Sequence, residues 1–264
     1  GPGVASDRCG DPGLVIRDWA WEAAMVFADT PRQLRVEVDR LPGAEIAWQL
    51  RFDSRGPGET GWTRHARGSL ERRRPEAQSA ASAPGPVPVP GPWSAGKAPQ
   101  ADHPALGLGP RWDCVTALAR DGGQVAGRLV APPPAEADMA CFAWHPALLD
   151  IALTLGLPTR QEAGEVADGF VPGDLVADPD RAADGGVQAR RLFAPVALAL
   201  AVLPPRLPPR LTTVCTRCQR LPGGALSLDL QLQDEAGAVL GWAQGLRMQA
   251  VDPGALARKP APGP

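Results

Sequence analysis

Asp150 is the residue whose type and setting most directly predict chemistry in this chain. It lies in the stretch His145–Gly156, where Pro146 suits the first turn of a helix and Gly156 suits its end. Nearly all the other residues of the stretch are apolar, so we expect this helix to be buried. A carboxylate on a buried helix needs a partner or a raised pKa, because an unpaired buried charge is costly. Thr154, four residues further on, is expected on the same stripe as Asp150.

Composition and charge exclude several classes of function. The chain of 264 residues has a formal net charge of −2 and a pI near 6.0, which leaves no basic surface for nucleic acid or an anionic membrane. No apolar run approaches the roughly 20 residues that span a bilayer. Five cysteines are an odd number without the spacing of a disulfide scaffold, so we expect reduced thiols and a cytoplasmic setting. Cys215 and Cys218 form a CxxC, but no second ligand pair accompanies it, so no metal is expected.

The apolar periodicity of the rest of the chain predicts mainly antiparallel strands. A helix is expected only at 146–155, and residues 159–187 are acidic and glycine-rich, which indicates a surface loop. The strands are expected at 15–27, 34–39, 46–53, 62–70, 112–118, 124–130, 193–203, 211–220, 226–233 and 239–248.

A Pro/Ala-rich stretch divides these elements into two groups. Residues 75–104 contain PGPVPVPGP and little to bury, so they are predicted to be an extended linker. Residues 4–74 would form a first half without its helix, residues 105–251 a second half with the helix, and residues 252–264 a flexible tail. This pattern predicts an α+β fold, a double hotdog in which antiparallel sheets wrap a central helix, with the first half atypical because its central helix is missing.

Four motifs, in this order, resemble the dehydratase domains of modular type I polyketide synthases. GWTRHARGSL (61–70) is similar to the end of the first hotdog in that family, and LGLGPRW (106–112) to the opening of the second. HPALLDIALTLG (145–156) resembles the family's HPxLLDxxxQ helix, and residues 226–251 resemble its closing hairpin. The resemblance covers most of the chain.

The resemblance implies a function for the helix. In this family the aspartate that Asp150 matches protonates the departing hydroxyl of a β-hydroxyacyl thioester, which an acyl carrier protein presents on its phosphopantetheine arm. Thr154 stands where the family usually has Gln or His, and Leu108 where it has Tyr before Gly109 and Pro110, so these residues are expected beside the substrate. The resemblance further implies neighbouring polyketide synthase domains and a homodimer as partners, and no cofactor of the domain's own.

The sequence departs from the family at the catalytic base. The family's HxxxGxxxxP segment would precede the stretch 15–27, where this chain has about a dozen residues. His65 is expected to be structural, and His103 begins HPALG but has Trp112 where the motif has proline. His145, five residues before Asp150, is expected to cap or pack the helix, with a role as proton partner as the alternative.

Standard dehydration is therefore not expected. Three alternatives stay open: a non-catalytic pseudo-enzyme kept for structure or carrier docking, a dehydratase-like cyclase or isomerase that uses Asp150 alone or with His145, and a base supplied from elsewhere. A buried carboxylate with a purely structural role is the fourth reading of Asp150.

Overall fold

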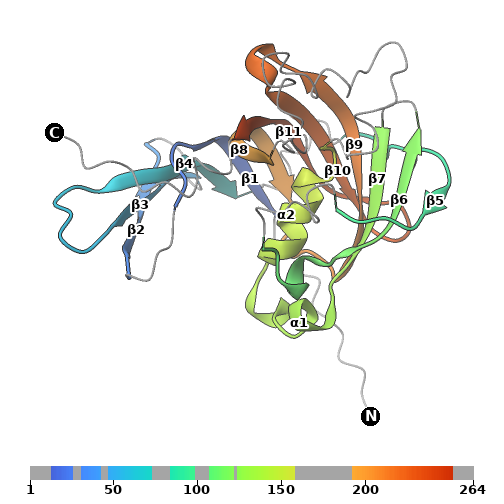
Figure 1. Ribbon diagram of the computed structural model, residues 1–264, viewed down its shortest axis with the longest axis horizontal. Coiled ribbons are helices and arrows are strands. Elements are labelled where there is room, and N and C mark those ends of the chain that lie inside the picture. The colour runs from blue at the N-terminus through green and yellow to red at the C-terminus, as the bar shows by residue number, and fades with distance from the viewer. Residues whose placement is uncertain are drawn as a thin grey trace, which may run out of the picture.

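One continuous antiparallel sheet organises the molecule. The structure, a computed structural model, describes residues 13–25, 31–42, 47–72, 84–98, 107–121, 124–157 and 192–251. Eleven strands form the sheet in the spatial order β2-β3-β4-β1-β8-β11-β10-β9-β7-β6-β5 (Figure 1). The strands are β1 (Leu14–Trp21), β2 (Gln33–Arg40), β3 (Ala47–Arg55), β4 (Thr63–Arg72), β5 (Trp93–Ser94), β6 (Val115–Asp121), β7 (Gln124–Val130), β8 (Leu192–Leu203), β9 (Arg210–Arg220), β10 (Leu226–Gln233) and β11 (Val239–Val251).

The order of the strands contains an internal repeat. Outward from the centre, one half reads β1-β4-β3-β2 and the other reads β8-β11-β10-β9, so each half connects its strands in the same way. The halves meet where β1 pairs with β8, with Leu14 opposite Leu203 and Ala20 opposite Ala197. Beyond β9 the second half adds β7, β6 and β5, whereas no described strand lies beyond β2. The double hotdog predicted from the sequence is confirmed.

The helix α2 (Pro146–Thr154) packs on the second half of the sheet (Figure 1). Its residues Ala147, Leu148, Ile151 and Ala152 are buried in the main core. The strands contribute alternate residues to the same core, such as the leucines 226, 228, 230 and 232 of β10. The prediction of a buried helix here is confirmed. Its apolar residues lie on several faces, so most of them must be shielded from water by the rest of the protein.

The first half has little core of its own. Among the described residues 13–72 there is no helix, and the buried apolar residues there are Ala47 and Ala66. Its larger apolar side chains form a half-buried aromatic group instead, in which the ring of Trp19 lies 5.6 Å from Phe52 and 6.2 Å from Trp21. The missing central helix that the sequence predicted is thus a feature of the described structure.

The described part of the Pro-rich segment, which the sequence predicted to be an extended linker, is docked on the sheet. This part, residues 84–98, is extended and includes β5, which pairs with β6. The backbone N–H of Val87 donates to Oε1 of Gln231 at 2.9 Å, and the side chain of Gln233 donates to the carbonyl of Val87 at 2.7 Å. Val87, Val89 and Trp93 also cover a small second core on this face. The segment therefore buries part of the polar face of β10. The alternation of polar and apolar residues along β10 would by itself predict that this face is exposed to water.

The other differences from the predicted elements are local. β1 ends at Trp21, before the predicted end of the strand, and Trp112 lies in a 3-10 turn (Pro110–Trp112) rather than in the strand that follows it. A short helix α1 (Pro133–Glu136) was not predicted. The predicted loop at 159–187 and the tail at 252–264 lie outside the described residues. No helix in the described part is long and apolar enough to cross a membrane.

Candidate functional site

Asp150 lies at the surface end of the contact between α2 and the 3-10 turn Pro110–Trp112. The indole Nε1 of Trp112 donates a hydrogen bond to Oδ2 of Asp150 at 3.0 Å. Sequence reasoning missed this partner, because Trp112 is 38 residues away and was assigned to a strand. The turn holds the indole in place, since the backbone N–H of Trp112 donates to the carbonyl of Gly109 at 3.0 Å. Two elements that are distant in sequence therefore fix one carboxylate oxygen.

The Asp150 carboxyl is only partly withdrawn from water. The residue is exposed, which corrects the expectation of a fully buried carboxylate. Protein atoms nevertheless crowd it, and this loss of hydration raises its pKa, while the hydrogen bond from Trp112 acts in the opposite direction. The carboxyl is therefore accessible from solvent although the protein around it reduces its hydration. A carboxyl that is reachable and holds its proton more firmly than usual can act as an acid.

Thr154 does not contact the carboxylate. Its hydroxyl donates to the backbone carbonyl of Asp150 at 2.9 Å, one turn back along the helix. This bond is the common local alternative for a threonine inside a helix. Asp150 and Thr154 therefore lie on the same side of α2 as predicted, but the Thr154 hydroxyl donates its hydrogen bond to the helix backbone.

Leu108, Gly109 and Pro110 are exposed and lead into the turn that carries Trp112. The turn packs against α2, so the structure brings the predicted segment to the same side of the molecule as Asp150. Leu108 is one of the few large apolar side chains that are exposed, at 36% of its surface.

His145 packs at the start of α2. It occupies the N-cap position, yet its side chain makes no capping hydrogen bond, which corrects the predicted side-chain cap. The residue is 1% exposed, and its ring meets Phe142 edge-on with centroids 5.5 Å apart. Its Nδ1 is buried and has no hydrogen-bond partner among the described residues. The predicted packing role is thus confirmed, and no hydrogen bond joins His145 to Asp150 in the described structure.

His65 belongs to a buried polar network in the first half. Its Nε2 lies 2.7 Å from Oγ of Ser54 and its Nδ1 lies 3.1 Å from the carbonyl oxygen of Ala23. Arg32 donates to the same Ser54 oxygen at 3.0 Å. A serine beside a histidine can form a nucleophile, but Ser54 is 0% exposed, so no substrate reaches it in this arrangement. The network ties three segments together, which agrees with the structural role predicted for His65.

The thiols of β9 are poor nucleophiles. Burial raises the pKa of Cys215 to about 12, and the neighbouring Cys218 and Asp229 act in the same direction. Burial also raises the pKa of Cys218 to about 11. Thiolate is the form that binds metals and attacks electrophiles, so this CxxC stays protonated at neutral pH. The described residues contain no cluster of three or more potential metal ligands, and His103 lies outside them.

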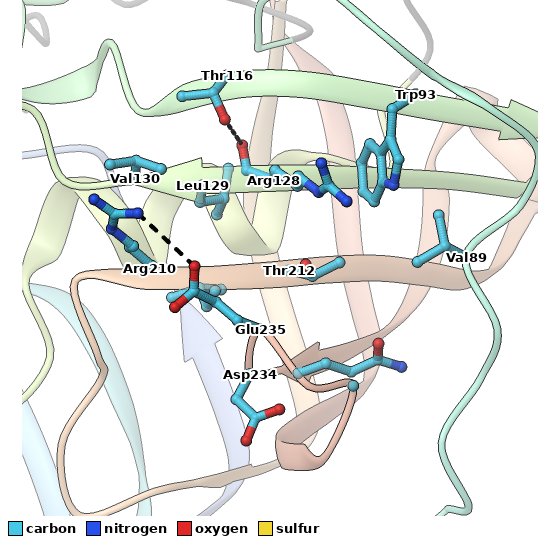
Figure 2. Close-up of a pocket in the computed structure, with 13 residues that line it drawn as sticks. Val89, Trp93, Thr116, Arg128, Leu129, Val130, Arg210, Thr212, Asp234 and Glu235 are labelled. Carbon is cyan, nitrogen blue, oxygen red and sulfur yellow. Dashed lines mark hydrogen bonds and ion pairs between the residues drawn. The ribbon is translucent and has the colours of Figure 1, made fainter.

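A pocket of about 380 Å³ lies away from Asp150, between the docked segment and the strands β6, β7, β9 and β10 (Figure 2). Val89 and Trp93 of that segment form one side, and the guanidinium of Arg128 stacks on Trp93 at 4.3 Å. Arg210 pairs with Glu235 across another part at 3.9 Å. None of the predicted site residues lines this pocket.

The comparisons with known proteins agree with this fold and this helix. Residues 95–175 match the family model of the polyketide synthase dehydratase N-terminal domain, and this range includes the 3-10 turn and α2. Among curated protein sequences, no relative matches the chain.

Several solved dehydratase domains share the fold. The dehydratase domain of RzxB from Pseudomonas fluorescens is 19% identical with a TM-score of 0.62, over 90% of this chain and 76% of that one. GphF dehydratase 1 is 20% identical with a TM-score of 0.62, over 95% and 78% of the two chains. The dehydratase from the CurF module of curacin polyketide synthase is 14% identical with a TM-score of 0.64, over 91% and 77%. The resemblance to polyketide synthase dehydratase domains that four motifs predicted is therefore confirmed, by the fold over most of the chain and by the family match at residues 95–175.

Proposed function

We propose that this chain receives a β-hydroxyacyl thioester from an acyl carrier protein and that Asp150 donates a proton to the β-hydroxyl group. The observation that carries the proposal is the Asp150–Trp112 pair, an accessible carboxyl with a raised pKa and one oxygen held by an indole N–H. Hydroxide is a poor leaving group until an acid protonates it, and an acid with a raised pKa is suited to this step near neutral pH.

The known dehydratase domains support the choice of residue. Two solved CurK dehydratase structures are of inactive mutants, one with a histidine replaced by phenylalanine and the other with an aspartate replaced by asparagine. In that protein, therefore, both a histidine and an aspartate are needed for activity. Asp150 is the one charged residue of α2, and it stands where the family's helix motif has its aspartate.

We further propose that this chain by itself does not complete the elimination. Both ring nitrogens of His65 are engaged, by Ser54 and by the backbone of Ala23, and His145 is buried against Phe142. The third histidine, His103, lies outside the described residues and has Trp112 where the family's HxxxGxxxxP motif has proline. Elimination needs a base to remove the proton next to the thioester carbonyl while the acid protonates the hydroxyl. The chain would then bind the substrate and supply one of the two proton transfers.

The test measures binding and product in the same samples. A 3-hydroxybutyryl pantetheine thioester is titrated into the protein and into its Asp150→Asn variant, and the mixtures are examined by mass spectrometry for the enoyl product. We expect the wild type to bind without forming the enoyl product. We expect Asp150→Asn to weaken binding by about threefold to tenfold, because the amide is a weaker hydrogen-bond donor than a protonated carboxyl and a neutral hydrogen bond is worth about 0.5–1.5 kcal/mol.

Each alternative outcome has a definite meaning. Enoyl product that disappears in Asp150→Asn would keep the acid role and overturn the absence of elimination. Equal binding by the two proteins would overturn the role of Asp150. A cyclised or double-bond-shifted product would select the cyclase or isomerase alternative.

The exposure of Asp150 favours a second candidate, a non-catalytic docking domain for the carrier protein. A carboxyl that lies at the surface needs no part in a reaction, and a docking domain would hold the carrier protein through other surface residues. The two candidates differ in one measurement, the affinity for an acyl carrier protein whose arm bears no acyl group. Affinity that is unchanged in Asp150→Asn, together with no binding of the free thioester, would establish the docking function and exclude the proposed one.

A further inference from the structure

The 3-10 turn Pro110–Trp112 carries two donors that reach two different carboxylates. Trp112 donates its indole N–H to Asp150 of α2, and the preceding residue, Arg111, donates from Nε to Oδ2 of Asp138 at 2.6 Å. Successive side chains of a 3-10 turn project about 120° apart, so neighbouring residues can reach different elements. The turn contacts both α1 and α2, and it joins the helix of the candidate acid to the segment that follows α1.

The segment that carries Asp138 is held by hydrogen bonds from two directions. Within the segment, the carbonyl of Asp138 accepts from the backbone N–H of Cys141 at 2.9 Å. From the loop between β8 and β9, Nη1 of Arg206 donates to the carbonyls of Met139 and Phe142 at 2.8 and 2.9 Å. Networks of this kind rigidify the backbone they connect. The Asp138 carboxylate is therefore a well-held partner for the turn.

The carboxylate of Asp138 does not cap its own segment. Asp138 is the N-cap residue of the 3-10 turn Met139–Cys141, yet its side chain makes no capping hydrogen bond there. Its Oδ2 atom instead accepts from Arg111, 27 residues away in sequence. The carboxylate can therefore be removed without removing a cap, so a substitution at this position tests the ion pair itself.

The other bonds of the turn are local. The backbone N–H of Trp112 donates to the carbonyl of Gly109, and the thiol of Cys114 donates to the carbonyl of Arg111 at 3.1 Å. These bonds lie within residues 109–114, so they shape the turn without tying it to a neighbouring element. The side chain of Arg111 supplies such a tie.

We propose that Arg111 and Asp138 are positioning residues that hold the turn so that the indole N–H of Trp112 is directed at Asp150. They act through Trp112 and not on the carboxyl itself. Their value for catalysis rests on the proposed function, whereas the direction of the indole requires no thioester.

The ion pair is suited to orientation more than to stability. The side chains of Arg111 and Asp138 are 48% and 34% exposed, and water screens such pairs. A hydrogen bond, however, weakens steeply as its angle bends, so a small rotation of the turn is enough to weaken the indole bond. We therefore expect loss of the pair to change the Asp150 carboxyl more than it changes the free energy of unfolding.

The variant Asp138→Ala distinguishes positioning from a direct effect of charge. If the pair acted through charge alone, removal of the negative Asp138 would lower the pKa of Asp150. If it acts by directing the indole, the same substitution raises this pKa, because the indole bond stabilises the carboxylate. We expect the rise, with a decrease of twofold or more in the acid dissociation constant of Asp150, measured by carbon-13 NMR titration of the whole chain.

A double variant tests whether the effect passes through Trp112. In a Trp112→Phe background the indole N–H is absent, so adding Asp138→Ala should leave the Asp150 titration unchanged. Glu22→Gln is the matched control, because it removes an exposed ion pair with Arg67 in the first half of the sheet. It should leave the titration of Asp150 as in the wild type. Arg111→Met, compared with and without Trp112→Phe, gives the same test from the other side of the pair and serves if Asp138→Ala does not fold.

An unchanged or lowered pKa of Asp150 in Asp138→Ala would overturn the positioning role. So would a rise of the same size with and without the indole. Failure of the proposed function is a separate result, because a wild type that binds no thioester still has an Asp150 carboxyl to titrate. The titration decides the role of the ion pair, and thioester binding decides the role of Asp150.

Discussion

Asp150 has its chemical character from two opposing influences. The surrounding protein reduces the hydration of the carboxylate and raises its pKa, and the indole of Trp112 stabilises the charged form. Burial is the larger influence, and the hydrogen bond from Trp112 limits it, because a carboxyl without a donor would hold its proton to higher pH and would be less firmly oriented. The pKa of Asp150 is thus set in part by Trp112, which lies outside α2.

Replacing Trp112 with phenylalanine should raise the pKa of Asp150 further. Phenylalanine keeps an aromatic ring against the core but removes the N–H that stabilises the carboxylate. The carboxyl would then remain protonated at a higher pH than in the wild type. Carbon-13 NMR titration of the Asp150 carboxyl measures this directly.

The matched control for that titration is Trp144→Phe. Trp144 donates its indole N–H to the backbone carbonyl of Pro204 at 2.7 Å and not to Asp150. Its loss should leave the Asp150 titration unchanged. An equal shift in both variants, or no shift in Trp112→Phe, would show that the indole bond does not set this pKa.

At the scale of elements, α2 approaches the sheet through positions without side chains. A Cβ at Gly127 of β7 would lie 2.7 Å from a methyl of Leu155, the residue that ends α2. A Cβ at Gly156 would lie 2.5 Å from the sulfur of Cys215. Both distances are below normal contact, so a side chain at either glycine would require the neighbouring leucine or cysteine side chain to move. The end of α2 is therefore closely packed against the strands.

Gly127→Val should therefore lower the free energy of unfolding by about 1–3 kcal/mol, the usual cost of overpacking a core. Urea denaturation measures the change. Gly61→Ala is the control, because a Cβ there meets no atom within 4 Å, and it should change stability by less than about 0.5 kcal/mol. Equal effects of the two substitutions would contradict the close seating of α2.

The docked segment 84–98 is held by side chains of β10. Gln231 is 1% exposed, accepts from the N–H of Val87 and donates to the carbonyl of Gly85 at 3.0 Å. Bonds to buried groups are costly to lose, because both former partners are left without water. Gln231 and Gln233 of β10 thus hold this irregular segment in a defined position on the sheet.

Gln231→Ala should release this segment. We expect a loss of about 1–3 kcal/mol in stability and faster chymotrypsin cleavage after Trp93, since two hydrogen bonds are removed from a buried site. Gln124→Ala, at an exposed position of β7, is the control. Cleavage at the same rate in the wild type and in Gln231→Ala would show that apolar contacts alone hold the segment.

At the scale of the whole molecule, the core is distributed unequally between two halves of similar topology. The second half packs α2 against its strands, whereas the described first half buries only Ala47 and Ala66 among its apolar residues. Ion pairs compensate in part, because the buried carboxylate of Asp53 contacts Arg35 and Arg64 and its pKa is lowered mainly by Arg35. These arginines are partly exposed, so water screens the pairs and limits what they contribute.

Hydrogen exchange should therefore be faster in the first half. Opening is easiest where few apolar contacts are lost, so amides of β3 and β4 are expected to exchange before those of β10 and β11. Exchange is followed by peptide mass spectrometry of the whole chain. Equal protection of the two halves would show that the sheet unfolds as one unit.

The sequence by itself determined the elements that a local pattern specifies. The alternation in 226–233 predicted β10, and the apolar stretch with Pro146 at its start predicted α2, because period and end signals are properties of neighbouring residues. The sequence also indicated Asp150 as a candidate site residue, because a single charged residue in an apolar helix can be recognised from the sequence alone.

The tertiary structure alone decided which distant groups meet. The bond from Trp112 to Asp150 and the burial of Gln231 beneath a Pro-rich segment both depend on residues far apart in sequence. No local pattern encodes them, because each arises from how the strands are ordered and where the chain crosses the sheet. The sequence therefore identified Asp150 as the candidate site residue, and the fold determined its hydrogen-bond partner and its access to solvent.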